Sequence, residues 1–215
     1  HHNRSFLRKD STLFTFGGYG FHTYRNDIHK YHLQTGVWEN IYYKGDTIPP
    51  RYLNGLGMLD EKTALIFGGY GSEKGRQELS PHNYYDLYSY NVETTESKKI
   101  WELNAEHYNF VVANSLVVDT LNNCFYALCF PHQKFDSYLQ LYCFSIEKPT
   151  YQILADSIPY SFSDISSYAD LYLSNDGKKL IALTTYTNEN ANEAVTNIYT
   201  LAFPPLQKAD LYQTE

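Results

Sequence analysis

The chain contains little of the sulfur chemistry on which many metal and redox sites depend. Its 215 residues include one Met and three Cys, namely Cys124, Cys129 and Cys143, whose spacing matches no metal-binding pattern. Two alternatives remain open for the cysteines. They are buried thiols that act as small apolar side chains, or they form one disulfide beside a free thiol. Since the two alternatives suit different redox environments, the cellular compartment of the protein also stays open.

Long apolar runs and an excess of basic residues are absent as well. No stretch of 18 apolar residues occurs, so we expect no direct insertion into a membrane. The formal net charge is −7, from 17 Lys and Arg against 24 Asp and Glu. Nonspecific binding to nucleic acid requires a basic face, so we expect no nucleic-acid partner.

Aromatic residues, in contrast, are abundant. They make up 17% of the chain, with 22 Tyr and 12 Phe. Half-buried pleated surfaces favour such side chains, which indicates sheets rather than helices. A hydrophobic share of 43% in 215 residues is enough for a sizeable core, in one large all-β domain or two small ones.

One motif occurs twice and organises the chain. Residues 13–20 read LFTFGGYG, and residues 64–71 read ALIFGGYG, 51 positions later. The same offset superposes Asn3 on Asn54. Each copy is an apolar strand pattern that ends in a glycine pair, where the backbone can adopt positive φ and pass close to a neighbour. A period near fifty residues is typical of a repeat architecture.

Four repeat units cover the chain in one phase, at about residues 1–43, 44–104, 105–155 and 156–215. The first two units each predict four short strands joined by tight turns. In the third unit Phe130 and Pro131 replace the glycine pair, and in the fourth a hairpin turn of sequence NDG is the clearest signal. Residues 210–213 are expected to form the last strand.

The glycine pair of the first unit, together with Tyr31 and Trp38, resembles the kelch repeat in residue type and spacing. Trp101 is taken as the counterpart of Trp38 in the second unit, and Tyr151 follows Phe144 at the same distance in the third. The resemblance implies an all-β fold, a β-propeller of four-stranded antiparallel blades with about four kelch-like blades in this chain. It also implies that Trp38 is buried, so Trp38→Ala is expected to lower stability by roughly 3 to 5 kcal/mol.

Three ways of closing such a ring remain open. Four blades form a compact ring, which we place first because the first and last residues fall at the same point of the repeat. Alternatively, two chains complete one ring, as a dimer, or the chain is part of a larger ring and a longer protein. In each case the stacking of blades around an axis hides the sheet edges.

The first function to consider is that of a kelch-type enzyme, which we treat as the alternative to a binding role. The galactose oxidase-like kelch superfamily includes a copper enzyme whose site uses Tyr, His and Cys, but the eight His of this chain are scattered and none pairs with another His and a Cys at ligand-like spacing. No Gly-x-Ser-x-Gly elbow, phosphate loop or Cys/His dyad occurs. We therefore expect no cofactor and no metal, while a carbohydrate-active oxidase or a sugar isomerase remains the alternative.

The favoured function is recognition by a non-catalytic binding module, such as the sensor part of a larger receptor. In propellers the loops before strand one and after strand two share one rim, and aromatic faces with Arg and Asn suit a protein, a carbohydrate or an anionic ligand. Arg25→Ala and Arg51→Ala are then expected to weaken binding while leaving thermal stability nearly intact. By position, the rim gathers Asn3, Arg4, Tyr19, His22, Tyr24, Arg25, Arg51, Asn54, Tyr70, Arg76, His82, His107, His132 and Lys134.

Overall fold

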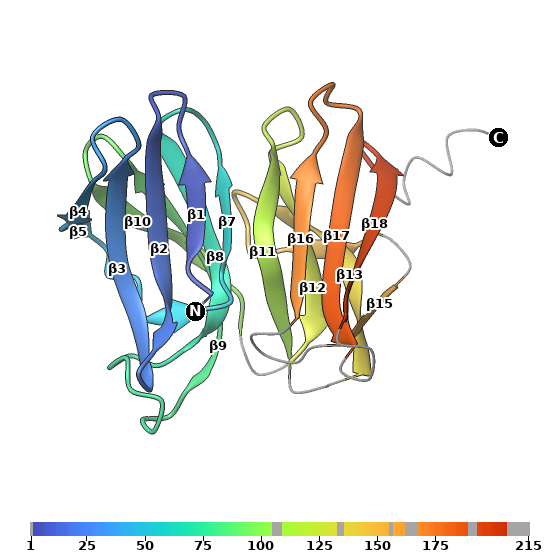
Figure 1. Ribbon diagram of the computed structural model, residues 1–215, viewed down its shortest axis with the longest axis horizontal. Helices are drawn as coiled ribbons and strands as arrows, with labels where there is room; N and C mark the ends of the chain where they lie inside the picture. Colours follow the sequence, from blue (N-terminus) through green and yellow to red (C-terminus); the bar gives the residue numbers. More distant parts are fainter. Residues whose placement is uncertain are drawn as a thin grey trace.

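The computed structural model describes residues 2–104, 109–132, 136–154, 157–161, 167–188 and 193–205, except for the side chains of residues 114 and 188. Strands and turns account for all regular structure in these ranges (Figure 1). The protein is therefore all-β, as the aromatic-rich composition predicts. Within the same ranges, no helix of a length and apolarity suited to crossing a membrane is found.

The strands form four consecutive groups, which we call units 1 to 4. Unit 1 is the antiparallel sheet of β1 (Arg4–Leu7), β2 (Thr12–Gly20), β3 (Thr23–His32) and β4 (Val37–Ile41). Unit 2 contains β7 (Gly55–Met58), β8 (Thr63–Gly71), β9 (His82–Asn91) and β10 (Glu96–Glu102). Unit 3 contains β11 (Phe110–Asp119), β12 (Cys124–Pro131), β13 (Asp136–Ser145) and β14 (Tyr151–Ile153). Unit 4 contains β16 (Tyr168–Leu173), β17 (Lys179–Asn188) and β18 (Glu193–Ala202).

Three short strands connect or extend these units. β5 (Lys44–Gly45) pairs in parallel with β10, β6 (Arg51–Tyr52) pairs with β8, and β15 (Ile158–Ser161) pairs with the start of β13. The linker from unit 1 to unit 2 is thereby paired with two strands of unit 2. The strand predicted at residues 210–213 lies outside the described residues.

The first strands of the four units lie along the middle of the molecule. β7 and β11 pair in parallel through Leu56 and Ser115, which joins units 2 and 3 into one continuous sheet. Figure 1 shows unit 1 in front of unit 2 and unit 4 in front of unit 3, with β1 and β16 as the strands of the two front units that lie nearest the middle. The units therefore extend outward from their first strands, two to each side.

Three hydrophobic clusters hold consecutive units together. Because side chains alternate across a strand, each sheet has two faces. We call the face on the side of the previous unit in chain order the preceding face, and the opposite one the following face. The same names are used for the equivalent faces of units 1 and 4, although no described unit precedes unit 1 or follows unit 4. Units 1 and 2 meet through a cluster that includes Phe16 and Tyr88, units 2 and 3 through Phe67 and Phe144, and units 3 and 4 through residues such as Phe130, Leu141, Leu171 and Ala182.

The glycine pairs do not end their strands as expected. β2 continues through Gly17 and Gly18 to Gly20, with a bulge between Phe16 and Gly18. Gly17 has φ +64°, and a Cβ there would lie 2.8 Å from the carbonyl oxygen of Arg51. The pair is thus needed for a left-handed bulge at a close contact between units. The turn that follows β2 is short, because β3 begins at Thr23.

The expected burial of Trp38 is wrong. Its side chain is 56% exposed, although its ring packs on Tyr31 with centroids 4.7 Å apart. Both residues lie on the preceding face of unit 1, and no hydrophobic cluster of the described residues covers that face. The predicted loss of 3 to 5 kcal/mol on Trp38→Ala therefore does not apply to this chain alone.

Trp101 is not the positional counterpart of Trp38. In unit 2 the residue opposite Tyr90 is Ser97, whereas Trp101 pairs with Leu87 after a bulge. The Trp101 indole Nε1 donates to the carbonyl oxygen of Ile146 at 2.9 Å. Trp101 therefore fastens unit 2 to unit 3 from the following face.

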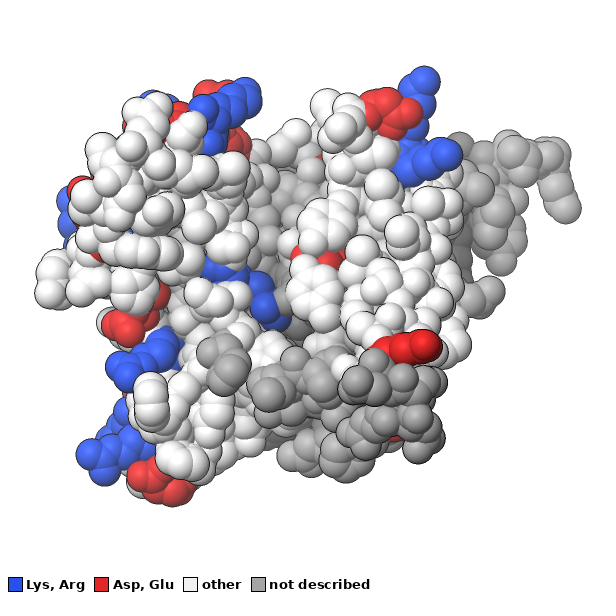
Figure 2. Space-filling model, in the orientation of Figure 1, with Lys and Arg blue, Asp and Glu red and all other residues white. Residues whose placement is uncertain are grey.

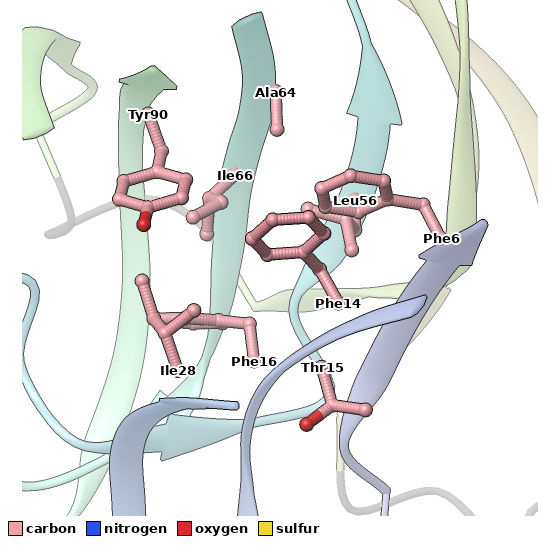
Figure 3. A pocket seen from close by; sticks show the side chains of 9 residues that line it. All are labelled: Phe6, Phe14, Thr15, Phe16, Ile28, Leu56, Ala64, Ile66 and Tyr90. Carbon is pink, nitrogen blue, oxygen red and sulfur yellow. The ribbon is translucent and has the colours of Figure 1, made fainter. Parts of the chain in front are cut away.

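The core between units 1 and 2 contains a small void of about 10 Å³ (Figure 3). Its lining is apolar except for Thr15 and the Tyr90 hydroxyl, and Phe6 and Phe14 stack beside it with ring centroids 5.2 Å apart. Figure 3 shows the Tyr90 hydroxyl pointing toward Ile28. That hydroxyl is buried and has no hydrogen-bond partner among the described residues.

All three cysteines are free and buried on β12 and β13. Of the two alternatives left by the sequence, the structure contains the buried thiols. Burial raises the pKa of the Cys129 thiol well above its ordinary value, so this thiol stays protonated at neutral pH.

Candidate binding surface

The lower end of the molecule in Figure 1 carries the β2–β3 turn, the β8–β9 loop and the entry into β1. These are the segments that the sequence predicts to form a rim. Six aromatic rings from units 1, 2 and 3 meet there within 4.6 to 6.1 Å of a neighbouring ring centroid. We call them the rim aromatic cluster, which consists of His2, Tyr19, Tyr24, Tyr52, Tyr70 and His132.

Strand pairing explains how these rings come together. Tyr19 lies opposite Tyr24 across the β2–β3 hairpin, and Tyr52 lies opposite Tyr70 where β6 pairs with β8. Tyr24 and Tyr52 stack across the two units at 5.8 Å with an angle of 20° between their planes. Tyr19 and Tyr70 occupy equivalent repeat positions just after the glycine pairs, so the two bulges direct both residues toward the same place.

Burial keeps three members of the cluster uncharged at neutral pH. Burial raises the pKa of Tyr24 to about 12, with smaller contributions from Tyr70 and Tyr19, and burial also raises the pKa of Tyr70. Burial lowers the pKa of His132, which keeps its imidazole neutral. Tyr19, Tyr52 and Tyr70 remain partly exposed. They present aromatic faces on which a flat apolar group can stack.

A hollow of about 260 Å³ adjoins the cluster in unit 1. The Arg25 guanidinium on its wall lies 4.0 Å from the Asp27 carboxylate, and both side chains are half exposed. A solvated pair at this distance holds its partners weakly, so Arg25 can turn toward a ligand. The hollow is lined by Asn3, Gly17, Gly18, Tyr19, Gly20, Phe21 and Arg25.

The β2–β3 turn places a strained aromatic residue beside this hollow. Phe21 and His22 have φ values of +52° and +61°, a combination that two-residue hairpin turns usually obtain with Asn and Gly. Phe21 is 95% exposed, so it gains nothing from burial to offset an unfavourable backbone conformation. Strained residues concentrate at functional sites, and Phe21 is the clearest such residue on the rim.

The β8–β9 loop fixes the position of this turn. The backbone N–H of Tyr24 donates to the Gly75 carbonyl oxygen at 2.6 Å, and Thr23 forms a bridge with Arg76. The Tyr19 hydroxyl donates to the Gln77 side chain. The hairpin that carries Phe21 is therefore held in place by the β8–β9 loop.

The structure brings together only part of the predicted rim. The cluster and the hollow contain Asn3, Tyr19, Tyr24, Arg25, Tyr70 and His132. His22 and Arg76 lie in the adjoining turn and loop, and the His82 ring packs 4.5 Å from that of Tyr84. His107 and Lys134 lie outside the described residues. Arg4, Arg51 and Asn54 are buried.

Arg51 cannot serve as a ligand contact in this arrangement. It is fully buried, and its guanidinium forms a two-pronged ion pair with Asp86, with Nη2 3.0 Å from Oδ2. Its Nε donates to the Pro49 carbonyl oxygen and Nη1 to that of Gly68, both at 3.0 Å. The guanidinium carbon also lies 4.0 Å from the Tyr84 ring centroid. Arg51 thus ties the linker to β8 and β9, and the expectation that Arg51→Ala leaves stability intact is corrected.

Arg4 and Asn54 lie at the contact between the inner strands. The Arg4 Nε donates to the Asn54 backbone oxygen at 2.8 Å. Burial lowers the pKa of Arg4 to about 10, and the Asp170 carboxylate opposes that shift. Asp170 accepts from the Ser115 backbone N–H at 2.8 Å and from the hydroxyls of Tyr168 and Tyr172 at 2.6 Å. These polar groups link the first strands of the units from inside.

Three residues that matter for this surface or for the contact between the inner strands were not predicted from the sequence. Tyr52, at the centre of the cluster, stands between Arg51 and Asn54, both of which were singled out. Phe21 follows the glycine motif directly, but its positive φ cannot be read from its identity. Asp170 carries no local motif at all.

No group of three His, Cys, Asp or Glu suited to a metal ion occurs among the residues that the structure describes. In comparisons with known proteins, no family model matches the chain, and no curated protein is significantly similar to it.

Proposed function

We propose that the chain is a non-catalytic binding module whose four units are consecutive kelch-like propeller blades, and that it binds a polypeptide partner through the rim. Support for the blades comes from the repeated packing of each following face on the next preceding face. The inner position of all four first strands also fits this architecture.

The observation that carries the binding proposal is Phe21. An exposed apolar ring in a strained backbone costs folding free energy, and such residues cluster at functional sites. Aromatic and Arg side chains are the residues on which protein interfaces most often depend. Phe21 stands beside the hollow and Arg25, at the edge of the rim aromatic cluster. Together they suit a segment with one apolar side chain for the hollow and one carboxylate for Arg25.

The surface charge agrees with this ligand class. Figure 2 shows blue Lys and Arg groups with fewer red groups at the lower left, where the β2–β3 turn and the β8–β9 loop lie in Figure 1. The whole chain carries a formal charge of −7, whereas basic groups outnumber acidic ones at this end of the face shown. Electrostatic complementarity of this kind assists encounter with an acidic segment.

Selection of binders from a random peptide display library, with the chain immobilised, tests the proposal. Phe21→Ser is compared with Leu121→Ser, a matched control because Leu121 is 96% exposed in the β11–β12 turn, at the other end of the molecule. We expect selected peptides to lose at least tenfold in affinity for Phe21→Ser and nothing for Leu121→Ser. Equal affinity for both variants contradicts the rim as the binding site. Failure to select peptides, with retention of a glycan on a glycan array, replaces the polypeptide partner by a carbohydrate.

A further inference from the structure

The preceding face of unit 1 presents an uncovered row of apolar side chains. Leu7, Leu13, Tyr31 and Trp38 are direct cross-strand neighbours from β1 to β4. Leu7 is 61% exposed and Trp38 56%. Burial of side chains of this size is worth roughly 1.5 to 3 kcal/mol each, so the row is a costly surface to leave in water.

The corresponding positions in units 2 and 3 are buried against the preceding unit. Tyr90 lies opposite Ser97 in unit 2, and Phe144 lies opposite Tyr151 in unit 3, as Tyr31 lies opposite Trp38. Tyr90 is 2% exposed and Phe144 is fully buried. The Phe144 ring packs 4.6 Å from Phe67 of unit 2. The repeat therefore assigns the Tyr31–Trp38 face to contact with another unit.

The following face of unit 4 is the complementary open face. Tyr168, Tyr172 and Ile198 project from it and are 42%, 43% and 66% exposed. The equivalent faces of units 1, 2 and 3 are each covered by the next unit. The described part of the chain thus ends its series of stacked units with one open face of each kind.

These two faces do not meet within the chain. Units 1 and 4 form the front layer in Figure 1, and because their clusters with units 2 and 3 lie behind them, both open faces turn to the viewer. Figure 2 shows that this front surface is largely uncharged, with most charged groups at its upper and lower ends. A half-turn about a vertical axis in front of this surface brings unit 1 of one copy face to face with unit 4 of another.

We propose that two copies of this chain associate with twofold symmetry, so that the Tyr31–Trp38 face of unit 1 in each copy packs on the Tyr168–Ile198 face of unit 4 in the other. The contact continues the stacking that already joins the units inside the chain, and one symmetric pair covers all four open faces. The proposal depends on the packing of the units and not on binding at the rim.

Light scattering after size exclusion, over a hundredfold range of concentration, tests this pairing. We expect the wild-type chain to have the mass of two copies, and Trp38→Glu and Ile198→Glu each to have the mass of one, with unchanged circular dichroism spectra. Leu121→Glu, at a still more exposed site off both faces, is expected to remain paired. A wild-type chain that stays monomeric throughout, or that forms open filaments, overturns the proposal.

Mixing the two variants distinguishes this arrangement from other dimers. A Trp38→Glu chain and an Ile198→Glu chain form one contact with both substitutions and one contact with neither. We expect the mixture to recover pairs that neither variant forms alone. If Ile198→Glu alone leaves the dimer intact, unit 1 packs on unit 1 and the proposed contact is wrong.

Discussion

Arg51 and Asp86, 35 residues apart, form a buried ion pair in which both guanidinium Nη atoms contact the carboxylate. We expect Arg51→Ala to lower the free energy of unfolding by about 3–5 kcal/mol, because it leaves the Asp86 charge buried without a partner. Chemical denaturation measures the loss. Lys9→Ala, which removes the exposed pair with Glu61, is the control and is expected to change little.

A double-mutant cycle checks the cause of that loss. Arg51→Met combined with Asp86→Leu removes both charges, so we expect the pair of substitutions to cost much less than the sum of the two single changes. An additive result means that Arg51 stabilises the fold through its contacts with Pro49, Gly68 and Tyr84 rather than through Asp86.

Tyr90→Phe is expected to stabilise the protein. The Tyr90 hydroxyl is buried beside the void between units 1 and 2, with no partner among the described residues, and leaving such a group unpaired costs about 1–3 kcal/mol. We expect a higher melting temperature for Tyr90→Phe. Tyr88→Phe is the matched control, because the Tyr88 hydroxyl donates to the Thr47 carbonyl oxygen at 3.3 Å. A loss of stability in Tyr90→Phe implies a bound water in the void.

Phe21→Gly separates strain from function in the β2–β3 turn. Relief of left-handed strain of about 1–2 kcal/mol is partly offset by about 0.5–1 kcal/mol of added unfolded-state entropy. We expect the free energy of unfolding to stay level or rise by up to about 1.5 kcal/mol, while peptide binding falls. Phe21→Ala keeps the Cβ and is expected to show no such gain. A large loss of stability in Phe21→Gly assigns the ring to folding.

Acid is expected to destabilise the protein through His132. Burial holds its pKa below the ordinary value of 6.5, so neutral His132 contributes stability that is complete above that value and is lost as pH falls toward the lowered pKa. We expect the melting temperature to fall more steeply below about pH 6.5 in wild type than in His132→Phe, which keeps a ring against Tyr70. Equal slopes contradict a role for His132.

The all-β class and the repeat could be predicted from the sequence, because a glycine pair at a fixed offset and alternating aromatic residues are local signals. The role of Arg51 could not, since its partner Asp86 comes from a strand that only the fold brings near. Trp38 shows the same limit. Its spacing in the sequence is that of a packed residue, but burial depends on a neighbouring face, and none of the described units supplies one.

Some of the residues that the sequence assigns to a rim lie together in the structure, and other members of the same cluster are absent from that prediction. Tyr19, Tyr24 and Tyr70 do meet there, because the glycine bulges recur at the same point of each unit. Tyr52 completes the cluster. It lies in a strand of two residues, which is too short to produce a hydrophobic periodicity in the sequence. Phe21 depends on a backbone conformation that residue type disfavours.

The most direct test of the binding proposal is a map of amide chemical-shift changes in the isotope-labelled chain on titration with a library-selected peptide. We expect the changes to concentrate in the β2–β3 turn, the hollow and the rim aromatic cluster, with Phe21, Arg25 and Tyr52 among the most affected. Amides of the opposite end, including that of Leu121, are expected to stay unchanged. Changes concentrated at that opposite end, or on the front faces of units 1 and 4, would contradict the account.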